Sequence, residues 1–350
     1  MCELLGMSFN LPVKPNISFR GFRRRGEYNP HGWGIAFYPD ESVQVIKEPV
    51  KAERSHLSRF LQDYEEVKSK IFVAHVRYSS VGSKSYKNTH PFYRELNGKE
   101  YVFAHNGTLS KYENLELGRF KPMGQTDSEY VFCHLLSCIE ERNITKWGKD
   151  DFEWIAGKLK KINNYGNFNC IFSDGELLFC YYDKNGYNSL CFVHRKPPYG
   201  EIKLLDPDWK INLAEEKRPE QTGYIVATGR LTDETWINFK FGELIVFKDG
   251  KMIYSNFRNV SETSEILLVD LSDLEVLILK TLRKSPHRLS LRELIEKVDN
   301  SKMEITSAIR SLLCKGYILQ DSHDKVKWNN DNATFYTNPA RRKEIERWIT

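Results

Sequence analysis

Met1-Cys2-Glu3-Leu4-Leu5-Gly6-Met7-Ser8-Phe9 opens the chain. The run 2–9 is short and mostly apolar, which predicts a buried β-strand at the start of the fold. If Met1 is removed, Cys2 becomes the first residue and carries both a thiol and a free α-amine. Because an α-amine has a pKa of about 8, it can act as a base at neutral pH. Cys2 is therefore a candidate nucleophile, although behind a retained Met1 it would be an ordinary residue.

The composition is that of a folded globular protein. The chain has 350 residues, 40% of them hydrophobic and 13% aromatic, which suggests a main domain with an appendage. No apolar run approaches the roughly 18 residues of a membrane helix, and we find no signal peptide. The seven cysteines are scattered, with no C-x-x-C pair. This usage favours a reducing cytoplasm, and we expect no metal and no organic cofactor.

From the N-terminus to about residue 260 the pattern is rich in strands. We expect a hairpin over 32–46, and helices over 57–65, 127–141 and 151–163. This order predicts an α+β domain over residues 1–260, with two packed sheets and helices outside them. Further strands are expected at 71–78, 100–105, 169–173, 177–182, 190–194, 223–228, 243–248 and 252–254.

A linker over 261–271 is expected to lead to a helical domain over 272–350. Its helices are marked by three capping boxes, each a Ser followed three residues later by Glu. Gly316 is expected to end the third helix. The segments 318–320 and 335–337 could pair as strands, and a last helix is expected over 339–348. Three helices and such a pair make a winged helix-turn-helix. The boxes are Ser272/Glu275, Ser290/Glu293 and Ser301/Glu304.

The winged helix leaves two interpretations open, DNA binding and protein docking. The net charge of the chain is +5, and residues 271–350 hold 15 Lys/Arg against 11 Asp/Glu. The exposed side of the third helix has two basic residues, Lys302 and Arg310, with one acid, Glu304. That supply is thin for neutralising phosphates. DNA is therefore a possible partner, and docking to a protein or self-association is favoured over it.

Four separate segments could supply the parts of an amide-hydrolysing site. Such chemistry needs a nucleophile, a base, donors for the developing oxyanion and groups that recognise the substrate. Besides the opening segment around Cys2, the chain contains His75-Val76-Arg77-Tyr78-Ser79-Ser80-Val81-Gly82, Asn88-Thr89-His90-Pro91-Phe92 with Phe103-Ala104-His105-Asn106-Gly107-Thr108-Leu109, and Gln125-Thr126-Asp127-Ser128-Glu129.

Each segment has a chemical part and an ordinary alternative. The Asn106 side-chain amide and the Gly107 N–H could form an oxyanion hole, although residues 105–107 are also a plausible hairpin turn. Arg77 suits a carboxylate, or a structural ion pair. Asp127 could accept from an ammonium group, or serve only as a helix N-cap. Arginine with aspartate is what an α-amino acid end demands, which points to glutamine or a γ-glutamyl amide.

These motifs, in this order and at these separations, resemble those of class II glutamine amidotransferases, which are N-terminal-nucleophile hydrolases with an αββα sandwich. The resemblance covers roughly residues 2–255. It implies that Cys2 is the nucleophile, that Asn106 and Gly107 form the oxyanion hole, and that Arg77 and Asp127 hold the carboxylate and amine of glutamine. The segments His31–Phe37 and Val226–Trp236 resemble a stand-alone branch that lacks a synthetase domain.

Two further residues belong to the candidate substrate site. Family members that make glucosamine phosphate carry Thr-His where this chain has Ser80-Val81, so Ser80 keeps a hydroxyl and the imidazole is lost. His90, which precedes Pro91, could bind substrate or be structural. His31 and Trp33, flanked by glycines, could belong to a mobile lid or to a buried hairpin.

The predicted function is the hydrolysis of glutamine to glutamate and ammonia. Ammonia would pass to a synthetase partner or another acceptor, since no nucleotide-binding motif is present. One alternative is a hydrolase of a larger γ-glutamyl amide. Another is a glutamine-responsive regulator that binds DNA.

Overall fold

The structure is a computed structural model that describes residues 2–78, 82–205, 210–218, 220–258, 260, 271–314, 317–321, 330–339 and 342–349. The chain divides into two compact units, residues 1–265 and 266–350, and each is considered by itself. Residues 261–270 of the expected linker lie outside the described residues, and so does Gly316.

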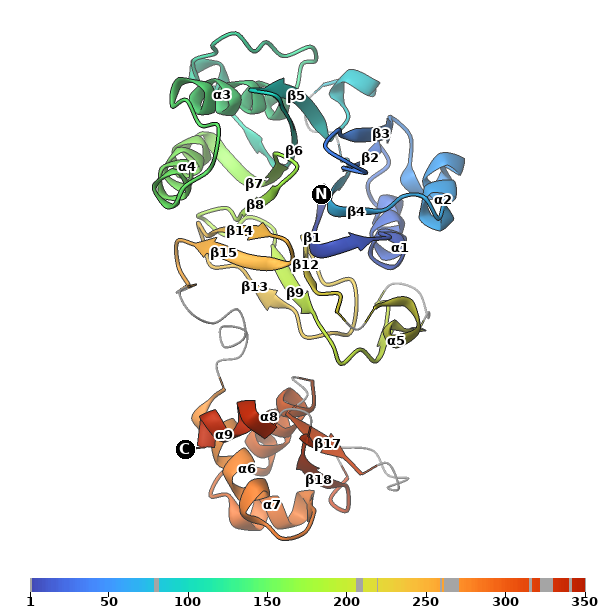
Figure 1. Cartoon of the computed structure of the whole chain (residues 1–350), viewed down its shortest axis with the longest axis vertical. Coiled ribbons are helices and arrows are strands. Elements are labelled where there is room, and N and C mark those ends of the chain that lie inside the picture. Colours follow the sequence, from blue (N-terminus) through green and yellow to red (C-terminus); the bar gives the residue numbers. More distant parts are fainter. Residues whose placement is uncertain are drawn as a thin grey trace. The chain divides into compact units, whose positions relative to one another are not determined.

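Two antiparallel sheets form the first unit (Figure 1). The seven-stranded sheet has the order β13(Ile237–Asn238), β9(Cys191–Arg195), β12(Gly223–Ala227), β1(Glu3–Val13), β4(Ser69–Val76), β2(Trp33–Phe37), β3(Gln44–Glu48). The six-stranded sheet has the order β15(Lys251–Ser255), β14(Leu244–Lys248), β8(Leu177–Tyr181), β7(Gly166–Ser173), β6(Lys99–Leu109), β5(Phe92–Leu96). The remaining elements are α1(Asn16–Arg24), α2(His56–Asp63), α3(Asp127–Glu141), α4(Lys149–Ile162), α5(Leu213–Glu216), β10(Glu201–Lys203) and β11(Lys210–Asn212).

The sheets face each other, and helices cover their outer faces. Gly6 in β1 lies so close to the six-stranded sheet that a Cβ there would meet the Ile171 side chain at 3.2 Å. On the outside of the seven-stranded sheet, Phe22 of α1 and Leu61 of α2 share one apolar core with β1 and β4. On the outside of the six-stranded sheet, the ring of Phe132 in α3 stacks on the ring of Phe103 in β6, with 5.3 Å between the ring centroids. The mixed α/β architecture with antiparallel sheets agrees with the prediction.

The main differences from the sequence prediction concern β6 and α1. Strand β6 continues to Leu109, and its residue Gly107 pairs with Phe168 in β7. The predicted hairpin turn at 105–107 is therefore wrong, because both neighbours of Asn106 are inside a paired strand. Helix α1 was not predicted, since its buried apolar positions are few and its sequence is broken by Gly21 and by arginines.

The segment with His31 and Trp33 belongs to a buried hairpin and not to a lid. Strands β2 and β3 pair over their whole length. Trp33 is buried, and its indole N–H donates to Glu48 Oε2 at 3.1 Å. Gly34 passes under the segment before β5, where an added Cβ would lie 2.3 Å from the His90 carbonyl oxygen. Of the two interpretations, the buried hairpin is confirmed.

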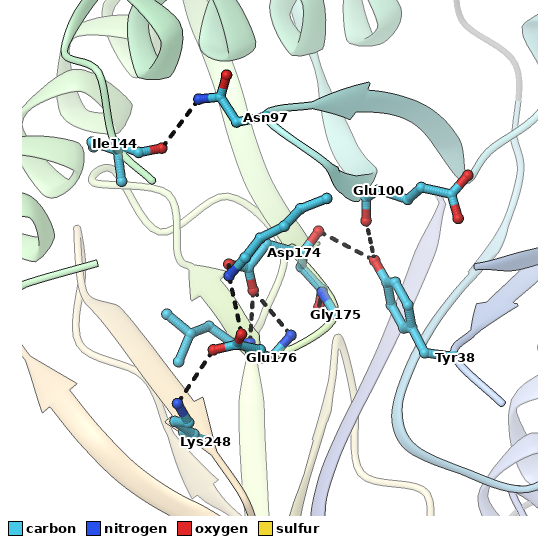
Figure 2. Close-up of polar contacts among 11 residues, drawn as sticks. Tyr38, Asn97, Glu100, Ile144, Asp174, Gly175, Glu176 and Lys248 are labelled. Carbon is cyan, nitrogen blue, oxygen red and sulfur yellow. Dashed lines mark hydrogen bonds and ion pairs between the residues drawn. The ribbon is translucent and has the colours of Figure 1, made fainter. Parts of the chain in front are cut away.

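A polar network fixes the turn between β7 and β8 (Figure 2). The buried carboxylate of Asp174 accepts the backbone N–H groups of Glu176 and Leu177 at 3.1 and 2.8 Å. Lys99, in β6, lies 3.2 Å from both Asp174 and Glu176. Lys248, in β14, lies 3.3 Å from Glu176. The turn between β7 and β8 is thus also attached to β6 and β14 of the same sheet.

Tyr38 connects this turn to the seven-stranded sheet. It follows β2, and its hydroxyl donates to the Glu100 carbonyl at 2.8 Å (Figure 2). Gly175 has a φ of +89°, and a Cβ there would lie 3.1 Å from the Tyr38 ring. The glycine is required both by the turn and by the aromatic ring that packs on it.

The second unit contains α6(Asp273–Lys284), β16(Leu289–Ser290), α7(Leu291–Lys297), α8(Lys302–Cys314), β17(Ile318–Gln320), β18(Thr334–Thr337) and α9(Arg342–Ile349). Its strands form an antiparallel sheet of order β16-β18-β17. All three predicted capping boxes are confirmed. At Ser272, for example, Oγ accepts the Glu275 N–H at 3.2 Å, and the glutamate accepts the Ser272 N–H at 2.7 Å. The other two boxes have the same pair of bonds.

Replacement of Asp174 by Ala should lower the free energy of unfolding by about 2–3 kcal/mol, because two N–H groups and a lysine lose their acceptor. Urea unfolding followed by circular dichroism measures the change. The matched control is Glu176→Ala, whose side chain is 55% exposed and whose loss should cost about 0.5 kcal/mol or less. Equal losses in the two variants would contradict this role for Asp174.

Candidate active site

Cys2 lies at the start of β1, where the pairing with β4 sets its surroundings. Glu3 pairs with Val76, so the next residues along β4 reach the thiol. The Tyr78 N–H donates to Cys2 Sγ at 3.1 Å, and the thiol lies 3.2 Å from the Tyr78 carbonyl oxygen. The residue is partly exposed, yet enough protein surrounds its sulfur that burial raises the pKa of the thiol to about 11. At neutral pH this thiol is protonated and needs a base before it can attack.

Arg77 is buried at the end of β4. Its guanidinium donates to the carbonyl oxygens of Gly82 and Ser83 at 3.3 and 3.2 Å. Burial lowers the pKa of Arg77, while Cys2 and the carboxylate of Asp127 oppose that shift. The structure thus brings the guanidinium within electrostatic reach of both groups. These two bonds attach the guanidinium to the loop that follows β4, and the alternative of a structural ion pair stays a prediction.

Asn106 approaches Cys2 from the opposite sheet, and Gly107 follows it in β6. The buried Asn106 side chain donates from Nδ2 to the Cys2 carbonyl oxygen. Gly107 passes so close to β7 that an added Cβ would lie 1.9 Å from the Asn167 carbonyl oxygen and 2.6 Å from His105 Nε2. Only glycine fits this position without displacing the strand. The candidate site therefore lies where the ends of β1, β4 and β6 meet.

Asp127 is the first residue of α3, and its N-cap is Thr126. The Thr126 hydroxyl accepts the Glu129 N–H at 3.2 Å. The interpretation of Asp127 as an N-cap is therefore wrong. Its Oδ1 accepts the Ser128 N–H at 2.9 Å, and its Oδ2 accepts the Leu109 N–H at 2.8 Å. The carboxylate ties the start of α3 to the end of β6.

Three buried histidines, His75, His90 and His105, lie close enough to influence one another electrostatically. His105 contacts the Ser128 hydroxyl through Nδ1 at 2.9 Å and the Asn167 carbonyl through Nε2 at 3.1 Å. The rings of His75 and His90 lie 4.2 Å apart. Among the described residues, neither ring has a hydrogen-bond partner.

The same two rings are uncharged at neutral pH. Burial lowers the pKa of His75 to about 3 and that of His90 well below its usual value. The guanidinium of Arg77 lowers the pKa of both rings further. The His105 backbone raises the pKa of His75 slightly, although it does not form a hydrogen bond with that ring. His90 also packs on Phe92 at 4.5 Å. The structure therefore places His90 as a neutral buried ring packed between His75 and Phe92.

Ser80, the remaining candidate, lies outside the described residues. The chain after it is anchored through Asn88. Asn88 Nδ2 donates to the Ser83 carbonyl at 3.1 Å, and Asn88 Oδ1 accepts the Gln125 N–H at 2.9 Å. The far end of this loop is thereby attached to the residues that precede α3.

Sequence analysis missed a group of residues behind Cys2. The Thr228 hydroxyl accepts the Leu4 N–H at 3.1 Å and donates to the Glu3 carboxylate. Arg25 lies 3.1 Å from the same carboxylate and also donates to the Arg230 carbonyl. The segment 226–236 was singled out in the sequence, but no local pattern could connect it to an arginine 200 residues earlier in the chain.

Tyr187 was also missed in the sequence. Burial raises the pKa of its hydroxyl, and the nearby Cys2 thiol raises that pKa further. Asn169 Nδ2 donates to the Tyr187 carbonyl at 2.9 Å, and Asn169 is the cross-strand neighbour of Asn106. No motif marked this loop in the sequence.

Two classes of feature are absent from the part of the chain that the structure describes. It contains no group of three or more His, Cys, Asp or Glu side chains that could hold a metal ion. It also contains no helix with the length and apolar character needed to cross a membrane.

Comparison with known proteins assigns the family. Residues 1–267 match the model for glutamine amidotransferases class-II. An uncharacterized protein of Methanocaldococcus jannaschii is 51% identical over 354 residues, which cover 99% of this chain and 96% of that protein. The Escherichia coli protein YafJ, whose name assigns it provisionally as a glutamine amidotransferase, is 38% identical over 259 residues, or 72% of this chain and 100% of YafJ.

One solved structure supports the same assignment. It comes from Pseudomonas aeruginosa, is described as a predicted glutamine amidotransferase, and has a TM-score of 0.54 at 30% identity over 72% of this chain and 100% of its own. The chain belongs to the class II glutamine amidotransferases. The relative from Methanocaldococcus jannaschii matches across the second unit as well.

Acid should destabilise the fold in a way that His75 controls. The unfolded chain protonates this ring below pH 6.5, whereas the folded chain does so only near pH 3. The unfolded state therefore binds more protons in that window, and the free energy of unfolding falls as the pH falls. From pH 7 to 4.5 one such ring accounts for about 2–3 kcal/mol.

The substitution His75→Phe should remove that share of the acid sensitivity. Urea unfolding at a series of pH values measures it. His56→Phe, at an exposed position, serves as the control and should keep the wild-type slope. An unchanged slope in His75→Phe would show that this ring is already protonated in the folded protein.

Proposed function

We propose that this chain hydrolyses the side-chain amide of glutamine to glutamate and ammonia in the cytoplasm, with Cys2 as the nucleophile after removal of Met1. The observation that carries the proposal is the convergence of the two sheets on Cys2. The Asn106 amide reaches its carbonyl oxygen, and Arg77 lies within electrostatic reach of both Cys2 and Asp127. The family membership supports the same reaction class.

The protonated thiol makes the α-amine of Cys2 the natural base. With a pKa of about 8, this amine can take the thiol proton as Sγ attacks the amide carbon. The carbonyl oxygen then becomes an oxyanion. Asn106 Nδ2 carries two hydrogens, so one can stay on the Cys2 carbonyl while the other stabilises the oxyanion together with the Gly107 N–H.

The second half of the reaction uses the same groups. The α-ammonium returns its proton to the leaving nitrogen, the C–N bond breaks, and ammonia departs from a γ-glutamyl thioester. Water then attacks the thioester while the amine accepts its proton. Glutamate leaves and the thiol is restored, so the cycle balances without a cofactor.

Arg77 and Asp127 would hold the amino acid end of the substrate. Guanidinium binds carboxylate in a bidentate manner. Oδ1 of Asp127 accepts the N–H and the hydroxyl of Ser128, whereas Oδ2 accepts the Leu109 N–H alone. A carboxylate oxygen can accept a second donor, so Oδ2 has room for one. An ammonium group can therefore bind there while α3 keeps its attachment. Ser80 and His90 are further candidates for this pocket, and of these two His90 is buried against His75 and Phe92 and would act through packing.

A hydrolase of larger γ-glutamyl amides is the second candidate. Tyr78, whose backbone holds the Cys2 thiol, exposes half of its surface (50%) and packs on His31 at 5.1 Å. Tyr78, the exposed member of this pair, lies beside Cys2 and could contact a substituent on the amide. Assays with glutamine and with γ-glutamyl conjugates separate the candidates, and activity on conjugates alone would favour the second one.

We further propose that residues 272–350 form a winged helix-turn-helix that docks to a protein, either a synthetase partner that takes the ammonia or a second copy. The order α6-β16-α7-α8-β17-β18 supports this topology. On α8, Lys302 already pairs with Asp331 at 2.7 Å, and Met303 is 80% exposed. An apolar residue beside a neutralised lysine suits protein contact better than phosphate contact, so DNA binding is not favoured.

Treatment with the glutamine-mimicking electrophile diazo-oxo-norleucine should add one label to a chain that has lost Met1. Intact mass and peptide mapping should place the label on Cys2. The variant Cys138→Ala, at a buried position on α3, should still be labelled, whereas Cys2→Ala should not. A retained methionine in the active protein, or label on another cysteine, would refute the proposed nucleophile.

Substitutions at Asn106 and Arg77 should affect different kinetic constants. Asn106→Ala should lower kcat roughly 10²–10³-fold with little change in KM, because the oxyanion exists only in the transition state. Arg77→Lys should mainly raise KM, because a point charge replaces a two-pronged contact in the ground state. Steady-state glutaminase assays measure both, and the reverse pattern would mean that the two roles are assigned wrongly.

A further inference from the structure

A cavity lies at the end of β1 that is opposite Cys2. Its volume is about 380 Å³, and the end of β1, Lys68 and the segment after α5 line it. Because β1 has 11 residues and a strand rises about 3.3 Å per residue, this cavity is roughly 35 Å from the nucleophile. Nothing in the proposed chemistry uses it.

The cavity carries an excess of positive charge. Four cations line it, Lys14, Lys68, Lys217 and Arg218, and Glu216 is the one carboxylate among the described lining residues. Lys14 is neutralised by an ion pair outside the cavity. For the other three cations, the described part of the chain contains no ion pair. Together with Glu216 they leave a net charge of +2 facing the cavity.

Lys217 has no ion-pair partner among the residues that the structure describes. Its ammonium lies 5.3 Å from the Phe9 ring centroid. Burial lowers the pKa of Lys217 to about 8, Arg195 and Lys14 lower it further, and two glutamates, Glu216 among them, raise it. The other glutamate, Glu234, is already bound by Arg195 at 2.7 Å. A half-buried cation therefore faces the cavity without an acid of its own.

We propose that this cavity binds a small phosphate monoester. A phosphate monoester carries a charge of about −1.5 to −2 at neutral pH, which matches the unbalanced charge, whereas a carboxylate would neutralise only half of it. The run Leu11–Val13 supplies an apolar wall for the esterified group. The volume lies in the range of small-metabolite sites. The anion would sit between Lys217, Lys68 and Arg218.

Calorimetric titration with phenyl phosphate and with benzoate at pH 7.0 and constant ionic strength tests the proposal, because the two probes share a ring and differ in charge. The wild type should bind phenyl phosphate with at least about tenfold preference over benzoate. The substitution Lys217→Met keeps the aliphatic stem over Phe9 and should weaken that binding at least about tenfold. The matched control Lys251→Met, at an exposed position of β15, should bind like the wild type.

Further measurements separate this site from the active site and from misfolding. Cys2→Ala should bind phenyl phosphate with unchanged affinity, so a failure here and a failure of the glutaminase proposal are distinguishable. Arg218→Met gives a second variant if Lys217→Met unfolds, and it too should bind more weakly. No phenyl phosphate binding to the wild type, equal affinity for benzoate, or undiminished binding by both variants would each overturn the proposal.

Discussion

Strand β1 has a partner on each edge, β4 on one side and β12 on the other, and the position of Cys2 depends on this double pairing. A strand at the edge of a sheet would leave its first residue free to fray. Here Leu4 and Leu5, which follow Glu3, are fully buried within three residues of Cys2. The Leu4 N–H is also bound by Thr228. The thiol is therefore held rigidly, although it stands at the start of the chain.

The electrostatics of the site follow from the same enclosure. Burial keeps the Cys2 thiol protonated, and it keeps the rings of His75 and His90 neutral. The positive charge of Arg77 is thus not opposed or increased by the two neutral rings of His75 and His90. Arg77 therefore offers a preformed positive charge to the carboxylate of a substrate. The thiol must still lose its proton to a base, and the substrate does not supply one. The proposed α-amine meets that need without a further side chain.

Local sequence signals predicted the elements whose ends are marked by side chains. Helix α3 begins and ends where predicted, and the Ser/Glu boxes of the second unit are confirmed. Elements without such marks were missed or shortened. Strand β6 was expected to stop at His105 because Asn-Gly is a common turn, but pairing with β7 overrides that local preference through Leu109.

The candidate site was predictable as a set of residues and not as a geometry. Motif order selected Cys2, Arg77, Asn106, Gly107 and Asp127. It could not indicate that the Asn106 side chain would contact the Cys2 backbone. The contact of Glu3 with Arg25 and Thr228 depends on pairing between distant strands. Such long-range contacts have no signature in a single sequence.

The pairing of β1 with β12 has a consequence for biosynthesis. Leu5 pairs with Ala227, so one edge of the first strand stays open until more than two hundred further residues have left the ribosome. At about 5–20 residues per second, that interval lasts roughly 10–45 seconds. An aminopeptidase has this period to cleave the initiator residue before the strand is enclosed. If Met1 is removed as proposed, its removal competes with closure of the sheet, and the late synthesis of β12 lengthens the time available for it.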